Sequence, residues 1–136
     1  MVGSFPQTKT AMLTILIVDD SPVAREILKK CLPRDKNYSI IEAGNGQEAL
    51  EKFCQYRPEV TFMDMTMPVM DGFQAIAEIK QVDPQAIIIA ATADVQQKAK
   101  ERIAKLGAFL HLPKPVTRQG VQNALQQAEQ SLKGAG

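Results

Sequence analysis

The sequence has no excess of charge of either sign, no long apolar run and only two cysteines. Its formal net charge of +1 over 136 residues argues against nucleic acid or an anionic membrane as the main partner, because both favour concentrated basic surface. No apolar run approaches the roughly 20 residues that span a bilayer. The N-terminus also lacks the apolar segment of a signal peptide, so we expect a cytoplasmic protein without membrane insertion. Cys31 and Cys54 have no metal-type spacing and are expected to be reduced, half-buried thiols.

The overall amino-acid composition is that of an ordinary globular protein. Hydrophobic residues make up 45% of the chain and charged residues 23%, which indicates one domain that is long enough to bury a core. Residues 1–11 show no hydrophobic periodicity and are predicted to form a flexible tail, and residues 134–136 a flexible C-terminus. The domain is therefore expected to span residues 12–133.

Short apolar segments alternate with amphipathic ones along this domain. Strands are predicted over residues 13–18, 38–43, 59–63, 86–92 and 108–112. Helices are predicted over residues 19–32, 46–56, 73–82, 95–107 and 116–132. This alternation predicts an α/β fold, a doubly wound five-stranded parallel sheet with five helices on both faces. The inward positions of the first two helices are expected to be Val23, Ile27, Leu28, Cys31, Leu32, Ala49, Leu50, Phe53 and Cys54.

Polar residues follow four of the five strands. Asp19 and Asp20 come after the first strand, Asp64 after the third, Thr92 ends the fourth and Lys114 follows the fifth. Each has an ordinary structural explanation, as a helix cap, a turn residue, a strand residue or a solvated lysine. Those explanations do not account for all five falling on one edge of the sheet, where open α/β folds bind ligands.

The chemistry of this set favours phosphoryl transfer. Facing carboxylates repel one another, and Mg²⁺ relieves the repulsion because it prefers oxygen ligands and leaves positions for water or phosphate. Lys114 would stabilise the charge of an incoming phosphoryl group, and Thr92 would donate a hydrogen bond to its oxygens. Asp64 is then the natural nucleophile for an acyl phosphate. Pro68 and Gly72 break the chain after it and clear access.

Four segments carry a resemblance to a known family. ILIVDDS, DMTMPVMDG, AATA and LPKP occur in order at the expected strand positions. Together they resemble the receiver domain of two-component response regulators, from Leu13 to about Leu132. The resemblance implies a flavodoxin-like sheet with the strand order 2-1-3-4-5, an order that chemotaxis receivers exemplify.

The resemblance also implies roles for the acidic residues. Asp64 would accept a phosphoryl group from a phosphohistidine on a sensor histidine kinase or a phosphotransfer protein. Asp20, Asp64 and the backbone carbonyl of Thr66 would bind Mg²⁺ directly, with Asp19 acting largely through bound water.

The remaining positions would transmit the signal. Thr92 and Lys114 would contact the phosphoryl oxygens, and the peptide bond before Pro115 would be cis. Thr92 would then move inward and a switch side chain, usually Tyr or Phe in the family, would follow; here that position is His111. His111 is either a surface strand residue or an imidazole that fills the inward pocket only when neutral, so that output weakens as pH falls.

The predicted function is that of a stand-alone receiver, because no output domain is recognised after the last helix. Its output would pass through the surface of the fourth helix, fifth strand and fifth helix to a downstream protein, as in chemotaxis-type receivers, and a phosphatase is a further candidate partner. The protein would be a self-dephosphorylating switch rather than a conventional enzyme. Three alternatives are a phosphorelay intermediate, an aspartate-nucleophile phosphatase of the haloacid dehalogenase type, and a nucleotide- or flavin-binding module. Thr66 stands where the phosphatase needs a second aspartate, and AGNGQEA is not a phosphate-binding fingerprint.

Overall fold

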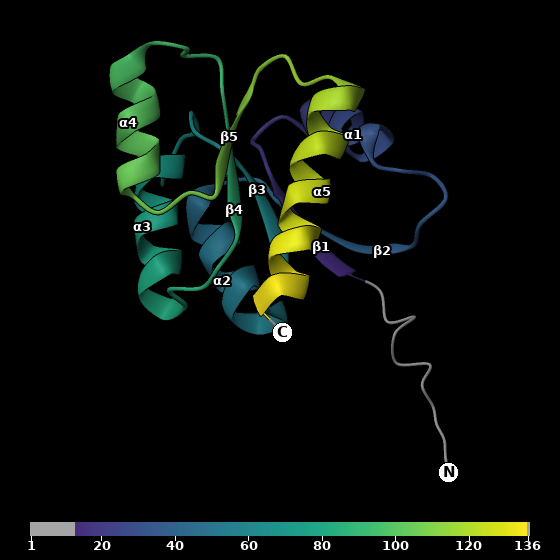
Figure 1. The fold of residues 1–136 in the computed structure, drawn as a ribbon. Helices are drawn as coiled ribbons and strands as arrows, with labels where there is room; N and C mark the ends of the chain where they lie inside the picture. The colour runs from purple at the N-terminus through teal and green to yellow at the C-terminus, as the bar shows by residue number, and fades with distance from the viewer. Residues whose placement is uncertain (1–12, 136) are drawn as a thin grey trace.

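The protein folds as a five-stranded parallel sheet with helices on both faces (Figure 1). The structure is a computed structural model that describes residues 13–135. The strands are β1 (Leu13–Val18), β2 (Tyr38–Ala43), β3 (Val60–Asp64), β4 (Ile88–Thr92) and β5 (Leu110–Pro113). The helices are α1 (Pro22–Cys31), α2 (Gly46–Tyr56), α3 (Gly72–Val82), α4 (Gln97–Lys105) and α5 (Arg118–Ala135). The strand order β2-β1-β3-β4-β5 confirms the predicted doubly wound α/β class.

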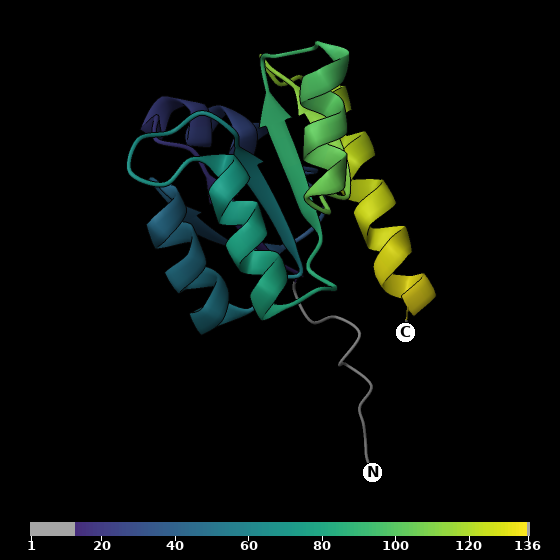
Figure 2. The same ribbon diagram turned by 90° about the vertical axis from the view of Figure 1, so that its left-hand side faces the viewer.

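Two apolar clusters, one on each face of the sheet, make up the core. Successive residues of a strand point to opposite faces, so Leu16 packs on the α2, α3 and α4 side while Ile17 packs on the α1 and α5 side. Figure 2 shows α2, α3 and α4 in front of the sheet, with α5 behind its edge. Burial on both faces is the reason that the strands read as nearly continuous apolar runs.

Side chains cap four of the helices, and in α5 the Thr117 hydroxyl accepts from the Gly120 N–H at 3.0 Å. The side chains of Ser21, Asn45 and Asp71 accept hydrogen bonds from backbone N–H groups of the first turns of α1, α2 and α3. Each bond satisfies a donor that the helix itself leaves free. Pro22 adds a preset backbone angle at the start of α1. The caps therefore help to fix where these helices begin.

Some predicted inward positions are wrong. Val23 is 69% exposed and Ile27 is 49% exposed, because the buried row of α1 is centred on Leu28 and Val23 lies about 140° around the helix axis from it. Cys54 is likewise exposed, since it lies about 100° from the buried Phe53 on α2. Cys31 is buried, so neither thiol is half-buried as expected.

The last helix is longer than predicted. Helix α5 runs to Ala135, beyond the predicted end at residue 132, and no proline interrupts its last turns. The flexibility of residues 134–136 stays a prediction. Residue 136 and the predicted tail at residues 1–11 lie outside the described residues. Over residues 13–135, none of the helices has both the length and the apolar character that crossing a bilayer requires.

Candidate functional site

The register of the sheet brings the predicted carboxylates together. Asp64 is the last residue of β3, and Asp19 directly follows β1. Val18 pairs with Met63 across the two neighbouring strands, so the residues that follow them reach the same edge. Both carboxylates are buried, with Asp19 8% and Asp64 5% exposed. Buried charges need partners, and this pair has one.

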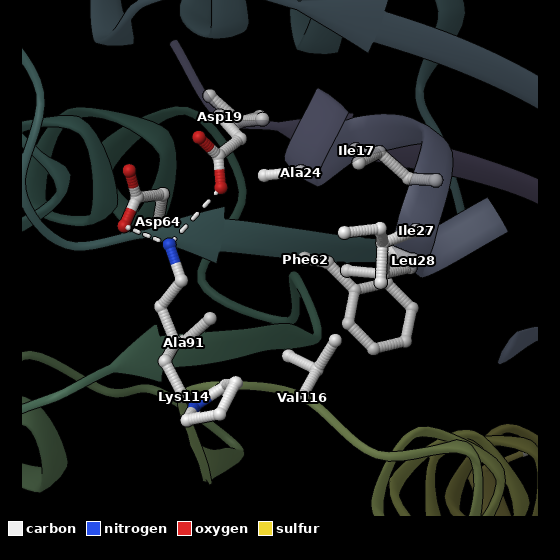
Figure 3. A pocket seen from close by; sticks show the side chains of 12 residues that line it. Ile17, Asp19, Ala24, Ile27, Leu28, Phe62, Asp64, Ala91, Lys114 and Val116 are labelled. Atoms are coloured by element: carbon white, nitrogen blue, oxygen red, sulfur yellow. Dashed lines mark hydrogen bonds and ion pairs between the residues drawn. The ribbon is translucent and has the colours of Figure 1, made fainter. Parts of the chain in front are cut away.

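The partner is the ammonium group of Lys114, which lies between the two carboxylates (Figure 3). Its Nζ is 3.1 Å from Asp19 Oδ2 and 3.2 Å from Asp64 Oδ1. The loop after β5 holds the lysine in place, because its backbone N–H donates to the carbonyl of Thr92 at 2.9 Å. The Lys114–Pro115 peptide bond is cis, as the resemblance implied.

The pKa values of Asp64 and Lys114 are both raised, for different reasons. Burial raises the pKa of Asp64, and the nearby charge of Asp19 raises it further, against the lowering effects of Lys114 and of the Thr66 N–H. Burial by itself lowers the pKa of Lys114, but hydrogen bonds and charges from the two aspartates outweigh it and leave that pKa raised. The lysine therefore stays cationic.

An apolar cavity of about 130 Å³ lies beside the two ion pairs. Phe62, Leu28 and Val116 line it beside the ion pairs, between β3, α1 and the loop before α5 (Figure 3). Apolar walls keep the local dielectric low, which strengthens each charge interaction at the site.

The donor set fits a magnesium ion. Asp19, Asp20 and Asp64 each offer one oxygen, and these oxygens lie within 4.8 Å of one another. Mg²⁺ binds oxygen at about 2.0–2.1 Å, so two ligands on opposite sides of the ion are about 4 Å apart. A small side-chain adjustment, or one bridging water, would bring oxygens that lie up to 4.8 Å apart to positions that the ion can bind. Thr66, the other predicted ligand, is exposed two residues beyond Asp64, and its N–H donates to Asp64 Oδ1 at 3.4 Å.

Two further predicted residues lie apart from this cluster. Thr92 ends β4 one position beyond Ala91, the register partner of Asp64, and its hydroxyl accepts a hydrogen bond from the Asp94 N–H at 3.0 Å. His111 lies on β5 and is exposed. Of its two predicted environments, the surface strand position is therefore the one found in this structure. The structure thus joins Asp19, Asp20, Asp64 and Lys114, leaves Thr92 on the same edge and places His111 outside.

A close contact explains the glycine that follows the acidic loop. A Cβ atom added at Gly72 would lie 2.5 Å from the carbonyl oxygen of Asp64 and 2.6 Å from the Cα of Met65. The Gly72 N–H also donates to the Met65 carbonyl at 3.3 Å. The loop therefore folds back against the backbone of Asp64 itself, an approach that only glycine allows.

Sequence reasoning missed Arg25. Its guanidinium donates from Nη1 to the carbonyl of Asp19 at 2.6 Å and from Nε to Glu42 at 2.8 Å. The only signal was a basic residue early in the first helix and a lone acidic residue within the second strand. Such a pattern is common on solvated surfaces, so the contact could not be predicted from it.

Comparisons with known proteins agree with this geometry. A family model described as "Response regulator receiver domain" matches residues 15–126. The chemotaxis protein CheY of Bacillus subtilis is 40% identical over 111 residues, which cover 82% of this chain and 92% of that protein. CheY of Halobacterium salinarum is 37% identical over 112 residues, with the same coverage of 82% and 92%. A solved CheX–CheY–BeF3–Mg complex from Borrelia burgdorferi contains a chain that matches with a TM-score of 0.82 and 25% identity, covering 90% of this chain and 94% of that one.

Proposed function

The chain belongs to the family of response regulator receiver domains and is homologous to CheY, and we propose that it accepts a phosphoryl group on Asp64. The donor is a phosphohistidine on a sensor histidine kinase or a phosphotransfer protein, and the reaction depends on Mg²⁺. The observation that carries this proposal is the position of Lys114 Nζ, within 3.2 Å of both buried carboxylates. Membership of this family argues against the two other functions considered, a haloacid dehalogenase-type phosphatase and a nucleotide- or flavin-binding module.

In the proposed reaction, a carboxylate oxygen of Asp64 attacks phosphorus. The bond between phosphorus and the donor imidazole nitrogen breaks, and that nitrogen keeps the electron pair. Lys114 Nζ lies 3.2 Å from Asp64 Oδ1, so it can move from the carboxylates to the phosphoryl oxygens and neutralise their charge. Mg²⁺, held by Asp19, Asp20, Asp64 and the carbonyl of Thr66, supplies further charge neutralisation when bound.

The proposed output follows from Thr92. Its hydroxyl would leave the Asp94 N–H and donate to a phosphoryl oxygen, drawing β4 toward the site. His111 would then turn inward as a neutral imidazole, and the surface of α4, β5 and α5 would change for a downstream protein. We propose a single-domain, chemotaxis-type role in the cytoplasm that ends by self-dephosphorylation, with a phosphatase as a further partner. A phosphorelay intermediate uses the same acceptor chemistry and differs only in its next partner.

Intact mass spectrometry tests the acceptor chemistry. The protein is incubated with acetyl phosphate and Mg²⁺, beside Asp64→Asn and a sample with a chelator. We expect one added phosphoryl group on the wild-type chain and none on the variant or in the chelated sample. Equal labelling of Asp64→Asn would move the acceptor elsewhere, and no labelling of the wild-type protein under any condition would refute the function.

A further inference from the structure

We infer that Arg25 is a positioning residue, aimed by Glu42, that fixes the Asp19–Asp20 peptide and so directs the Asp20 carboxylate toward the cation site. The inference rests on the proposed function, because it concerns Mg²⁺ binding by the same acidic residues. Arg25 donates to Glu42 and to the Asp19 carbonyl rather than to a carboxylate that would hold the ion.

Three hydrogen bonds define the geometry. Arg25, on the first turn of α1, donates from Nη1 to the Asp19 carbonyl at 2.6 Å and from Nε to Glu42 Oε1 at 2.8 Å. Lys29 donates to the other oxygen of Glu42 at 2.8 Å. Hydrogen bonds from Lys29 and Arg25 lower the pKa of Glu42, so it stays ionised and holds the guanidinium in one orientation. A bond to a charged donor is also stronger than a neutral one.

The Arg25 bond acts on a group of Asp19 that its other hydrogen bonds do not reach. Its N–H donates to the carbonyl of Ala43 at 3.1 Å, and its Oδ1 accepts from the Ser21 N–H at 2.9 Å. Neither of those bonds involves the Asp19 carbonyl, which accepts from Arg25 Nη1. Because the peptide unit is planar, fixing that carbonyl also fixes the N–H and Cα of Asp20.

Asp20 depends on its backbone more than its neighbours do. Lys114 holds the side chains of Asp19 and Asp64. The Asp20 carboxylate is exposed, and the structure records no hydrogen bond to it from residues 13–135. The place of the Asp20 Cα therefore sets where its carboxylate can lie. A rotation of the Asp19–Asp20 peptide would move those positions away from the cation site. Groups that orient a metal ligand in this way are typically worth about 10–100-fold in metal affinity.

A merely structural ion pair predicts the opposite result. If Arg25 only tied α1 to β2, its loss would remove a positive charge from the neighbourhood of an acidic cluster. Coulomb's law then predicts that a divalent cation binds more tightly. The positioning role predicts weaker binding, so the sign of the change in Mg²⁺ affinity separates the two.

The experiment measures Mg²⁺ dissociation constants by calorimetry for the full chain and four variants. We expect Arg25→Gln to weaken binding by about 10-fold, and Glu42→Gln to weaken it by less, because the guanidinium remains but loses its anchor. Arg25→Lys keeps the charge but cannot donate to both partners, so we expect intermediate weakening. The matched control is Arg118→Gln, which removes a 2.9 Å arginine bond to the carbonyl of Lys30 away from the site and should leave the affinity unchanged.

A second readout is taken without added metal. The ¹⁵N order parameter of the Asp20 amide should fall in Arg25→Gln and in Glu42→Gln, and stay constant in Arg118→Gln. If Arg25→Gln binds Mg²⁺ as tightly as the wild-type protein or more tightly, and the order parameter is unchanged, the positioning role alone is overturned. Absence of Mg²⁺ binding by the wild-type protein would instead overturn the proposed function and the inference together. If Arg25→Gln does not fold, Arg25→Lys decides the question, because it keeps the charge: weaker Mg²⁺ binding supports the positioning role, and unchanged binding overturns it.

Discussion

Replacement of Gly72 by alanine should both destabilise the protein and disturb the acceptor site. The added Cβ would lie 2.5 Å from the carbonyl oxygen of Asp64, 2.6 Å from Met65 Cα and 2.8 Å from Met65 Sδ. Carbon atoms pack at about 3.5–4.0 Å, so the backbone at the end of β3 has to move by roughly 1 Å. The sulfur can rotate away, but the two backbone atoms cannot.

The magnitude follows from the cost of overpacking. Extra carbon in a packed region typically costs about 1–3 kcal/mol, and a contact with backbone belongs in the upper half of that range. Helix propensity works in the other direction, because alanine is better than glycine in a helix by up to about 1 kcal/mol. We therefore expect a net loss of about 2 kcal/mol in the free energy of unfolding. A shift of about 1 Å at Asp64 should also slow phosphorylation, by up to about 100-fold.

Urea denaturation followed by circular dichroism measures the stability loss, because the chain has no tryptophan. With a slope of about 2 kcal/mol/M for a domain of this size, the midpoint should fall by about 1 M. Gly134→Ala is the matched control: it gains the same propensity, and a Cβ there meets nothing within 4 Å. A midpoint of Gly72→Ala that equals or exceeds that of the wild-type protein would refute the reasoning from contact distances.

Three further predictions concern β3 and the loop that follows it. Val69 has a φ of 71° and an 83% exposed side chain, so Val69→Asn should stabilise the protein by about 1 kcal/mol; no gain in the urea midpoint would contradict this. The buried Thr61 hydroxyl has no hydrogen-bond partner among the described residues, so Thr61→Val should raise the free energy of unfolding by about 1 kcal/mol. The pKa of Asp64 is raised above its ordinary 3.8, so its ionisation opposes folding above that pH and not below it. Without Mg²⁺, Asp64→Asn should therefore be more stable than the wild-type protein at neutral pH, with the gain vanishing toward pH 3.8; a less stable variant at neutral pH would contradict the sign.

Strand positions and the convergence of the acidic residues were predictable from the sequence. Strand β1 and helix α2 have the predicted bounds, because apolar runs and capping residues are local signals. Asp19, Asp64 and Lys114 could be placed on one edge because all strands of a parallel sheet end there. This reasoning needs only the residue that follows each strand.

Side-chain environments were less predictable. Val23 and Ile27 belong to an apolar stripe, but the width of the stripe that becomes buried depends on how much of α1 its neighbours cover. The exposure of His111 has the same origin, since strand periodicity does not reveal what packs on an edge strand such as β5. The Arg25 contact joins a helix, a strand and a loop backbone, and no local pattern encodes such a meeting.

The sequence by itself determined the alternating architecture and the identity of the residues at the strand ends, because hydrophobic periodicity and capping act over a few neighbouring residues. Only the tertiary structure decided that Lys114 lies between two carboxylates that are 95 and 50 positions away along the chain. It also decided that burial raises the pKa of Asp64 and that Gly72 rests against the Asp64 carbonyl. These properties depend on distances between segments and on the solvent that packing removes, and both arise only when the sheet and its two helical layers assemble.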